Sequence, residues 1–176
     1  MNPVIYWFRQ DLRLSDLRGL SAAVATGRPV LACYILDDES PGQWRMGAAS
    51  RWWLHHSLTA LSADIERAGG QLHLASGRPE MILARLAEQT GADLVCCSRQ
   101  YEPWARQLEE DLHTALGERG IAFKRYAGSL LWEPETVSTL AGTPFKVFTP
   151  FWRKCRDLPP AEEAGVPARF TVWPTD

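Results

Sequence analysis

Residues 4–38 read VIYWFRQDLRLSDLRGLSAAVATGRPVLACYILDD, and this stretch carries the signals of a strand, a helix and a second strand. Val4–Phe8 is a continuous apolar run, which is typical of a buried strand. Leucine and valine side chains then recur at helical spacing up to residue 24, with Ser15 placed to cap the helix. Residues 29–36 form a second apolar run that ends at two aspartates.

The same alternation continues to residue 126. Helices are predicted over about 46–68, 79–91 and 103–118, and further strands over 72–75, 92–97 and 121–126. The strands are apolar throughout rather than alternating, which indicates a parallel sheet covered by helices on both faces. Because crossovers between parallel strands are right-handed, the pattern predicts an α/β fold with a doubly wound five-stranded parallel sheet.

A sheet of this kind binds ligands at the carboxyl ends of its strands, so the loops that follow the strands are the informative ones. These loops span residues 9–14, 37–46, 76–79, 98–103 and 127–135. The first loop carries Arg9, Asp11 and Arg13. These three charges either form a salt-bridged turn that fixes the loop, or provide a polar rim for a ligand or a second domain.

Common motifs for phosphate binding and nucleophilic catalysis are missing from the sequence. The first strand runs into residues 7–14, WFRQDLRL, which lack the glycines of GxGxxG, so the architecture is Rossmann-like without a dinucleotide fingerprint. Neither a GxxxxGK[ST] loop nor a GxSxG turn occurs. His55 and His56 are adjacent on a predicted helix and point about 100° apart, so they cannot share a metal ion. The cysteines, which lack metal-ligand spacing, are Cys33, Cys96, Cys97 and Cys155. No metal site is therefore predicted.

Composition narrows the class of protein. The 45% hydrophobic and 23% charged residues are those of a globular domain, and the net charge of −2 gives no basic excess for binding DNA through its phosphates. No apolar run approaches the roughly 20 residues of a membrane helix. The first ten residues lack the basic start of a signal peptide. We therefore expect a cytoplasmic protein with no membrane partner.

The periodicity of the sequence changes after Gly128. No helical period persists there, and aromatic residues crowd together between 145 and 152. From Asp157 onward the chain is rich in Pro, Glu and Ala, which is typical of a linker. We therefore predict an α/β domain over 1–128, an exit segment over 129–156 that packs on it, and a linker over 157–176 toward a further domain.

Four segments resemble one family, the DNA photolyases and cryptochromes. They are 7-WFRQDLRL-14, 50-SRWWLHHSL-58, 101-YEP-103 and 145-FKVFTPFW-152. They occur in the family's order and span roughly residues 4–155, which is nearly all of the predicted folded part. One departure is Leu17-Arg18, where the family commonly continues with an Asn-Pro-like pair.

The resemblance implies the N-terminal α/β domain of a deoxyribodipyrimidine photolyase, a carbon-carbon lyase that repairs pyrimidine dimers in DNA with light. In such proteins FAD lies in a C-terminal helical domain, and DNA with pyrimidine dimers binds only through that domain. The N-terminal domain packs against it and in many members holds an antenna chromophore. By this resemblance the present chain has no FAD site, no dimer pocket, no catalytic residue and no activity of its own.

The resemblance carries an antenna site over only in part. Family members with a methenyltetrahydrofolate antenna use an Asn-Glu pair where this chain has Trp104 and Ala105, so a folate would need Glu102 as a substitute. Other members bury a deazaflavin or flavin at the strand ends. By position, the cofactor-binding residues expected for such a ligand are Arg9, Asp11, Asp37, Met46, Arg51 and Glu102. The alternative is that several of these residues only anchor loops and the further domain.

Three other functions stay open at this point. A cryptochrome-like blue-light photoreceptor would share the same N-terminal domain. A nucleotide-binding module of similar architecture is a second possibility, although residues 98–104 contain no glycine for a phosphate loop. The third is a bare interaction module whose surface is the aromatic cluster of Phe145, Phe148, Phe151 and Trp152. We expect part of this cluster to be exposed.

Overall fold

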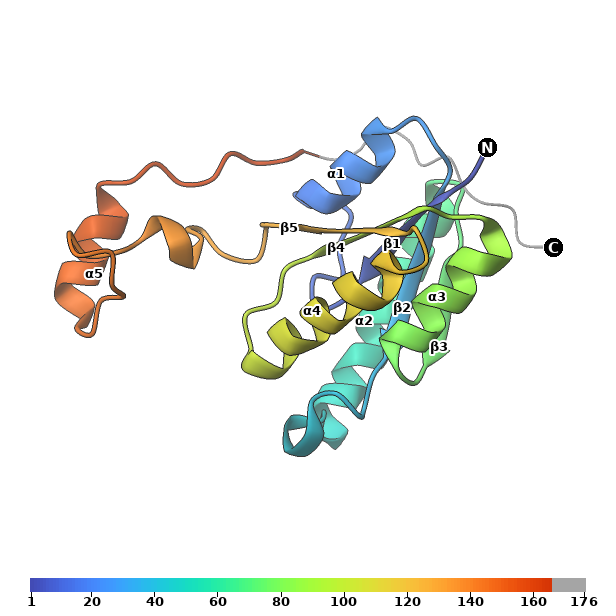
Figure 1. Cartoon of the computed structure of the whole chain (residues 1–176), viewed down its shortest axis with the longest axis horizontal. Helices are drawn as coiled ribbons and strands as arrows, with labels where there is room; N and C mark the ends of the chain where they lie inside the picture. The colour runs from blue at the N-terminus through green and yellow to red at the C-terminus, as the bar shows by residue number, and fades with distance from the viewer. Residues whose placement is uncertain (166–176) are drawn as a thin grey trace.

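A five-stranded parallel sheet forms the centre of the computed structural model, which describes residues 1–165 (Figure 1). The strands are β1 (Val4–Phe8), β2 (Val30–Leu36), β3 (Leu72–Ser76), β4 (Leu94–Ser98) and β5 (Ala122–Tyr126). Their order across the sheet is β3-β2-β1-β4-β5, and every neighbouring pair is parallel. The chain therefore starts in the middle and winds outward in both directions, as the apolar runs predict.

Helices cover both faces of this sheet. They are α1 (Arg18–Ala25), α2 (Ala48–Arg67), α3 (Pro79–Thr90) and α4 (Pro103–Gly117). The side chains of α1 and α2 pack on one face, and those of α3 and α4 pack on the other. The predicted α/β class and doubly wound topology are confirmed.

The pleat of β1 divides the core into two layers. Val4, Tyr6 and Phe8 belong to the α1–α2 side, whereas Ile5 and Trp7 belong to the α3–α4 side, and all five are buried. A central strand that is apolar at every position is required when both of its faces are covered. The same pleat directs Trp7, near the carboxyl end of the strand, toward α4.

The loop after β1 departs from the expected helix cap. Helix α1 begins after Leu17 with no side-chain cap, rather than after Ser15. Asp16 has a φ of 52°, in the left-handed region, and its carboxylate accepts a hydrogen bond from the backbone of Ala164. The backbone oxygen of Ser15 accepts a hydrogen bond from the side chain of Arg13. One local and one long-range hydrogen bond thus fix this loop, while α1 begins without a capping side chain.

A helix that periodicity did not indicate lies in the exit segment, α5 (Phe148–Arg156). It stands away from the α/β body, while residues 162–164 return to α1 through hydrogen bonds to Arg18 and Ser21 (Figure 1). The short helix η2 (Pro134–Thr136) lies in the chain between β5 and α5. It is held next to the end of β4, because Arg99 forms ion pairs with Glu133 and Glu135. The division of the chain at residues 128 and 156 remains a prediction, and residues 166–176 of the predicted linker lie outside the described part.

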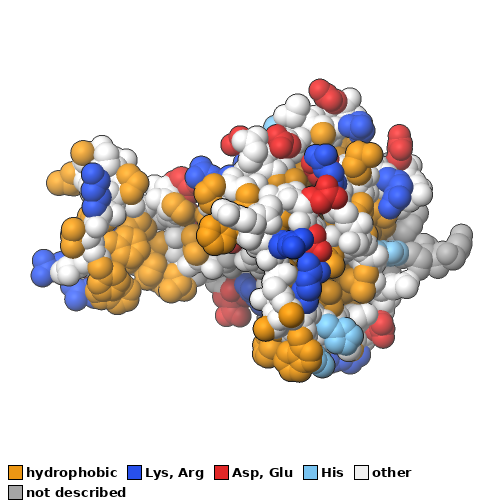
Figure 2. Space-filling view, turned by 90° about the horizontal axis from the view of Figure 1, so that it is seen from below, with side chains coloured by type: hydrophobic (Ala, Val, Ile, Leu, Met, Phe, Trp, Pro, Cys, Tyr) orange, Lys and Arg blue, Asp and Glu red, His pale blue; other side chains and the backbone are white. Residues whose placement is uncertain are grey.

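The aromatic cluster of the exit segment is largely open to solvent, as expected. Phe148 and Trp152 are 71% and 48% exposed, and Phe151 is 38% exposed. The rings of Phe148 and Trp152 stack with centroids 6.4 Å apart. Figure 2 shows hydrophobic side chains gathered on the part of the molecule that projects from the body. Within residues 1–165, no helix combines the length and apolar character needed to cross a bilayer.

Candidate ligand site at the carboxyl end of the sheet

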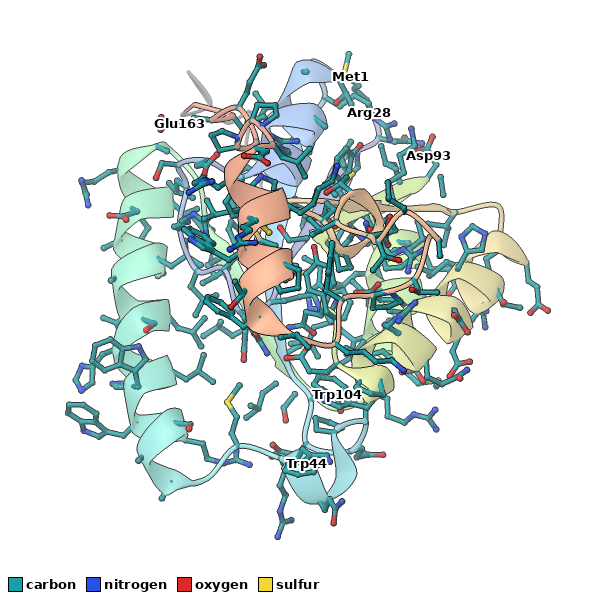
Figure 3. All side chains as sticks on the ribbon, turned by 90° about the vertical axis from the view of Figure 1, so that its left-hand side faces the viewer. Met1, Arg28, Trp44, Asp93, Trp104 and Glu163 are labelled. Carbon is teal, nitrogen blue, oxygen red and sulfur yellow. The ribbon has the colours of Figure 1, made fainter. Side chains whose placement is uncertain are left out.

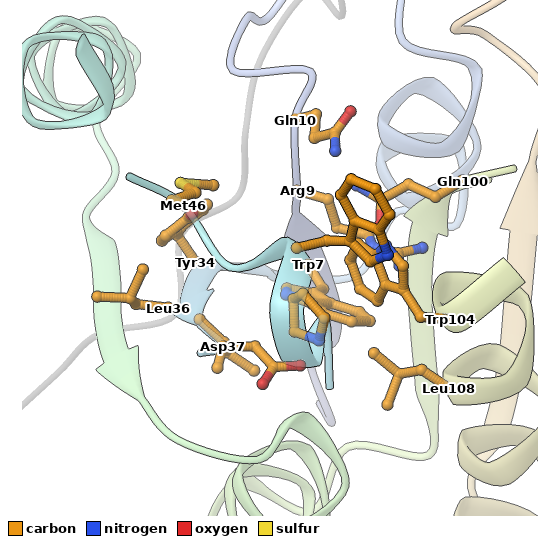
Figure 4. Close-up of a pocket in the computed structure, with 13 residues that line it drawn as sticks. Trp7, Arg9, Gln10, Tyr34, Leu36, Asp37, Met46, Gln100, Trp104 and Leu108 are labelled. Atoms are coloured by element: carbon orange, nitrogen blue, oxygen red, sulfur yellow. The ribbon is translucent and has the colours of Figure 1, made fainter. Parts of the chain in front are cut away.

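A pocket opens where β1, β2 and β4 end, at the edge where parallel sheets bind ligands. Figure 3 shows Trp44 and Trp104 together at this edge, opposite Arg28 and Asp93 at the other end of the sheet. The residue Trp7 closes the inner end, and Tyr34, Leu36 and Met46 line one side (Figure 4). Most of this lining is aromatic or aliphatic, so the pocket suits a flat apolar ring.

Two polar atoms in this lining are buried without a hydrogen-bond partner in the described part of the chain. One is Nε1 of Trp7, whose side chain is only 3% exposed. The other is Oδ2 of Asp37, whose Oδ1 accepts backbone hydrogen bonds from Glu39 and Ser40 at 2.9 and 3.0 Å. A buried polar atom without a partner costs about 1–3 kcal/mol. The pair therefore offers one donor and one acceptor to a ligand.

Arg9 forms the polar wall of the pocket, but its charge is already compensated. Its guanidinium lies 4.6 Å from the centre of the Trp7 ring, in cation–π geometry. The same guanidinium forms an ion pair with Glu109 and donates to the backbone oxygen of Ser98. Both Arg9 and Glu109 are buried. Arg9 thus serves as a rigid, stacked wall rather than as a free cation.

The loop that carries Asp37 is held in place by Arg51. Arg51 lies in the first turn of α2, pairs with Asp38 at 2.6 Å and donates to the backbone oxygen of Met46. This contact places Met46 on the pocket lining, although Arg51 itself does not line the pocket. Burial raises the pKa of the neighbouring Tyr34 phenol to about 12, with a smaller contribution from the charge of Asp38.

Asp11 and Glu102 also lie outside the lining. Asp11 accepts a backbone hydrogen bond from Arg9 at 3.4 Å, and its second carboxylate oxygen is buried and unpartnered within residues 1–165. Glu102 accepts from the backbone of Tyr101 and from the side chain of Gln10. Both carboxylates therefore shape the loops that border the pocket, and their part in binding remains a prediction.

The structure thus brings together three of the six expected residues, Arg9, Asp37 and Met46. Arg9 and Asp37 directly follow the ends of β1 and β2, and Met46 lies just before α2. The sequence reading did not select Trp7 or Trp104 for this site, because tryptophan is most often a packing residue. The signal that could have found Trp7 is the strand pleat, which directs it to the same face as Ile5 and toward α4.

A shallower groove adjoins the pocket along the first turns of α2. It shares Arg9, Gln10 and Met46 with the pocket and continues past Ser50 and Trp53. The enclosed part of the pocket is about 120 Å³, which is smaller than the roughly 300–1,000 Å³ of typical ligand sites. A bound ring with a side chain would therefore extend from the pocket into this groove.

Comparisons with known proteins point to one family. The DNA photolyase family model matches residues 4–168. Over 98% of this chain, a deoxyribodipyrimidine photo-lyase of Agrobacterium fabrum (strain C58) is 46% identical. Cryptochrome-1 of Arabidopsis thaliana is 33% identical over 88% of this chain. A crystal structure of a bacterial class III photolyase from Agrobacterium tumefaciens superposes with a TM-score of 0.90 and 43% identity, over 98% of this chain.

The chain is much shorter than these proteins. It spans 36% of the Agrobacterium fabrum enzyme, 23% of the plant cryptochrome and 36% of the solved photolyase. The matched part includes the carboxyl edge of the sheet, where the pocket lies.

Proposed function

The chain belongs to the DNA photolyase family, and from that premise we propose that it is the light-harvesting and docking domain of a deoxyribodipyrimidine photolyase. The observation that carries the proposal is the pocket at the strand ends, with its unpartnered Trp7 Nε1 and Asp37 Oδ2. Buried polar atoms without a partner also occur elsewhere in residues 1–165, but these two lie in the lining of an apolar pocket, where a ligand can reach them.

The residues present fit a flat heterocyclic chromophore. Trp104 and Tyr34 supply apolar walls, the Nε1–H of Trp7 can donate to a ring oxygen or nitrogen, and Asp37 can accept from a ring N–H. When bound, the chromophore supplies absorption of blue or near-ultraviolet light, with the energy passed to FAD in the further domain. The chain itself holds the ring in one orientation and keeps water away from it.

Two antenna classes compete for this pocket. A flavin or deazaflavin type suits a site at the strand ends, because the pocket there is lined by aromatic rings. A methenyltetrahydrofolate type lacks its usual partner, since fully buried Ala105 replaces the expected Glu. Glu102 lies outside the lining and is occupied by Tyr101 and Gln10, which weakens the case for it as a substitute. These contacts favour the flavin type.

The docking role rests on α5. Phe148, Phe151 and Trp152 present an apolar surface that no element of residues 1–165 covers, and the last turn of the helix adds the basic Arg153 and Lys154. We assign this surface to the C-terminal FAD-binding helical domain, because the relatives extend well beyond the span of this chain. DNA with pyrimidine dimers would be bound by that domain alone.

A cryptochrome-like photoreceptor is the second candidate, supported by the 33% identity to the plant cryptochrome. The higher identity to a photolyase over nearly the whole chain favours the enzyme. A repair assay with the complete protein on ultraviolet-irradiated DNA separates them. Light-dependent loss of pyrimidine dimers supports the photolyase, whereas no repair with FAD bound supports the photoreceptor.

The first experiment is an absorption spectrum of the purified chain from about 300 to 500 nm, where tryptophan and tyrosine contribute little. A band in this range means that the domain holds an antenna by itself, and its position distinguishes a folate from a flavin. The matched sample is a Trp7→Phe variant, purified in parallel. If the wild-type chain shows no band and binds none of FMN, a deazaflavin and methenyltetrahydrofolate when they are added, the light-harvesting role is refuted.

A further inference from the structure

Glu109 is the most deeply buried charged residue in the described part of the chain, and the proposed function gives it no task. It lies in the middle of α4 and is 1% exposed. Its Oε1 accepts hydrogen bonds from Arg9 and from the backbone of Gln100, and its Oε2 accepts from Arg125 at 2.9 Å. A buried carboxylate is tolerated only when such partners compensate its desolvation.

The partners of Glu109 come from three strands. Arg9 follows β1, Gln100 follows β4, and Arg125 belongs to β5. Two of these three, Arg9 and Gln100, line the pocket, whereas Arg125 does not (Figure 4). A single carboxylate on α4 therefore fixes two neighbouring segments of the pocket wall, and the same helix supplies Trp104 to the lining.

We propose that Glu109 is the positioning residue of the pocket: it holds Arg9 flat against Trp7 and holds Gln100 at the rim, and so sets the shape into which the chromophore fits. Without the ion pair, Arg9 is a long, flexible side chain beside an apolar cavity, free to turn into it or toward solvent. The part of this inference that concerns ligand binding rests on the proposed function.

Glu109→Gln tests the proposal and Arg125→Gln is its control. A glutamine offers one acceptor oxygen instead of two, and its amide nitrogen cannot pair with a guanidinium, so Arg9 loses its ionic partner in either orientation. Arg125→Gln also breaks an ion pair of Glu109, but it leaves both bonds of Oε1 in place. If Glu109→Gln does not fold, Glu109→Asp replaces it, because it keeps the charge while withdrawing the carboxylate by one C–C bond of about 1.5 Å.

Two readouts separate positioning from stability. The Nε–Hε signal of Arg9 in NMR spectra of the 176-residue chain reports its place over the Trp7 ring, since ring currents shift protons at that distance. The signal is assigned by its loss in Arg9→Lys. The second readout is the dissociation constant for FMN and for methenyltetrahydrofolate, each titrated separately and followed by absorbance.

We expect Glu109→Gln to move the Arg9 signal and to weaken binding about tenfold, in line with the effect of removing outer partners of ligand-holding residues at metal sites. Arg125→Gln should leave the signal in place and change binding by less than about twofold. An unmoved Arg9 signal in Glu109→Gln overturns the proposal, and so does a moved signal with unchanged affinity. If the wild-type chain binds neither probe, the proposed light-harvesting role is wrong. In that case the position of the Arg9 signal in Glu109→Gln still decides whether Glu109 holds Arg9 in the pocket lining.

Discussion

Replacing Trp7 by phenylalanine should separate the stability of the empty chain from its affinity for a chromophore. In the ligand-free chain the Nε1–H of Trp7 is buried without a partner in the described residues, which costs about 1–3 kcal/mol. Phenylalanine removes this donor but also loses part of the buried indole, at a packing cost of about 1–2 kcal/mol. The two effects have opposite signs, so we expect the free energy of unfolding to change by no more than about 1 kcal/mol.

Binding should respond differently, because the lost donor is the one that a ligand would use. A net hydrogen bond of about 1 kcal/mol corresponds to roughly fivefold weaker affinity. Phenylalanine still offers Arg9 an aromatic face, so the wall of the pocket is kept. Urea unfolding followed by circular dichroism gives the stability, and titration with the chromophore identified by the absorption spectrum gives the affinity.

Trp132→Phe is the matched control for this experiment. The Nε1 of Trp132 is also buried and unpartnered within residues 1–165, but the residue does not line the pocket. It should shift stability in the same manner as Trp7→Phe while leaving affinity unchanged. If Trp7→Phe binds as tightly as the wild-type chain, the idea that the ligand accepts a hydrogen bond from Trp7 is wrong.

Three further predictions follow from the described contacts. Asp37→Asn keeps Oδ1, which accepts the backbone hydrogen bonds of the turn, but replaces the unpartnered Oδ2 by an amide nitrogen. The affinity for the chromophore should weaken about fivefold in the same titration. The free energy of unfolding should change by about 0.5 kcal/mol or less. Burial raises the thiol pKa of Cys96 from 9.0 to about 11 and that of Cys97 from 9.0 to about 12, so the unfolded chain loses these protons at lower pH than the folded chain. The contribution of the two thiols to the free energy of unfolding is therefore complete below about pH 9 and is lost as the pH rises toward 12. Urea unfolding curves at about pH 8 and 10 would detect this loss. Replacing Phe148 and Trp152 by serine should change the free energy of unfolding of the α/β body by no more than about 0.5 kcal/mol, because both side chains are exposed. The double variant should self-associate less than the wild-type chain in light scattering. Greater aggregation would contradict a docking role for α5.

Local sequence was sufficient to predict the sheet, because its three central strands are apolar runs and turn residues bound all five strands. Val4–Phe8 has the predicted bounds, and the predicted helix at about 46–68 is observed as Ala48–Arg67. The three central strands β1, β2 and β4 are buried on both faces, so their apolar character does not depend on distant partners, whereas the edge strands β3 and β5 are partly exposed. The order of strands then follows from the handedness of the crossovers rather than from any single residue.

Helix α5 escaped prediction for a local reason. It has only nine residues and contains Pro150, which usually argues against a helix. Pro150 lies in the first turn of the helix, where backbone N–H groups have no intrahelical partner and a proline is tolerated. Two aromatic residues stacked one turn apart then replace the apolar stripe that a helix packed on a core would show.

The site was only partly predictable, because the side chains at a strand end can point inward or pair with each other. Sequence position located Arg51 near the pocket, but its ion pair with Asp38 is a tertiary contact that spacing does not reveal. The same holds for Arg9 and Glu109, which are 100 residues apart. Arg51, Asp11 and Glu102 contact the loops that border the pocket, and a part in binding stays a prediction for all six candidate residues.

The arginines of the loop after β1 are engaged with the protein itself, so in the proposed site recognition falls to other groups. Arg9 is tied to Glu109 and Ser98, and Arg13 donates to the backbone oxygens of Asp16 and Gly128, so both arginines fasten β1 to neighbouring segments. With these charges engaged, a bound ring would be held by stacking and by two or three hydrogen bonds. In the proposed antenna role, energy transfer would depend on the fixed orientation of the chromophore more than on its affinity, and an apolar slot lined by rings would favour one orientation. A pocket with free arginines would bind anions more tightly but would hold a ring less uniquely, because long charged side chains adapt to many poses.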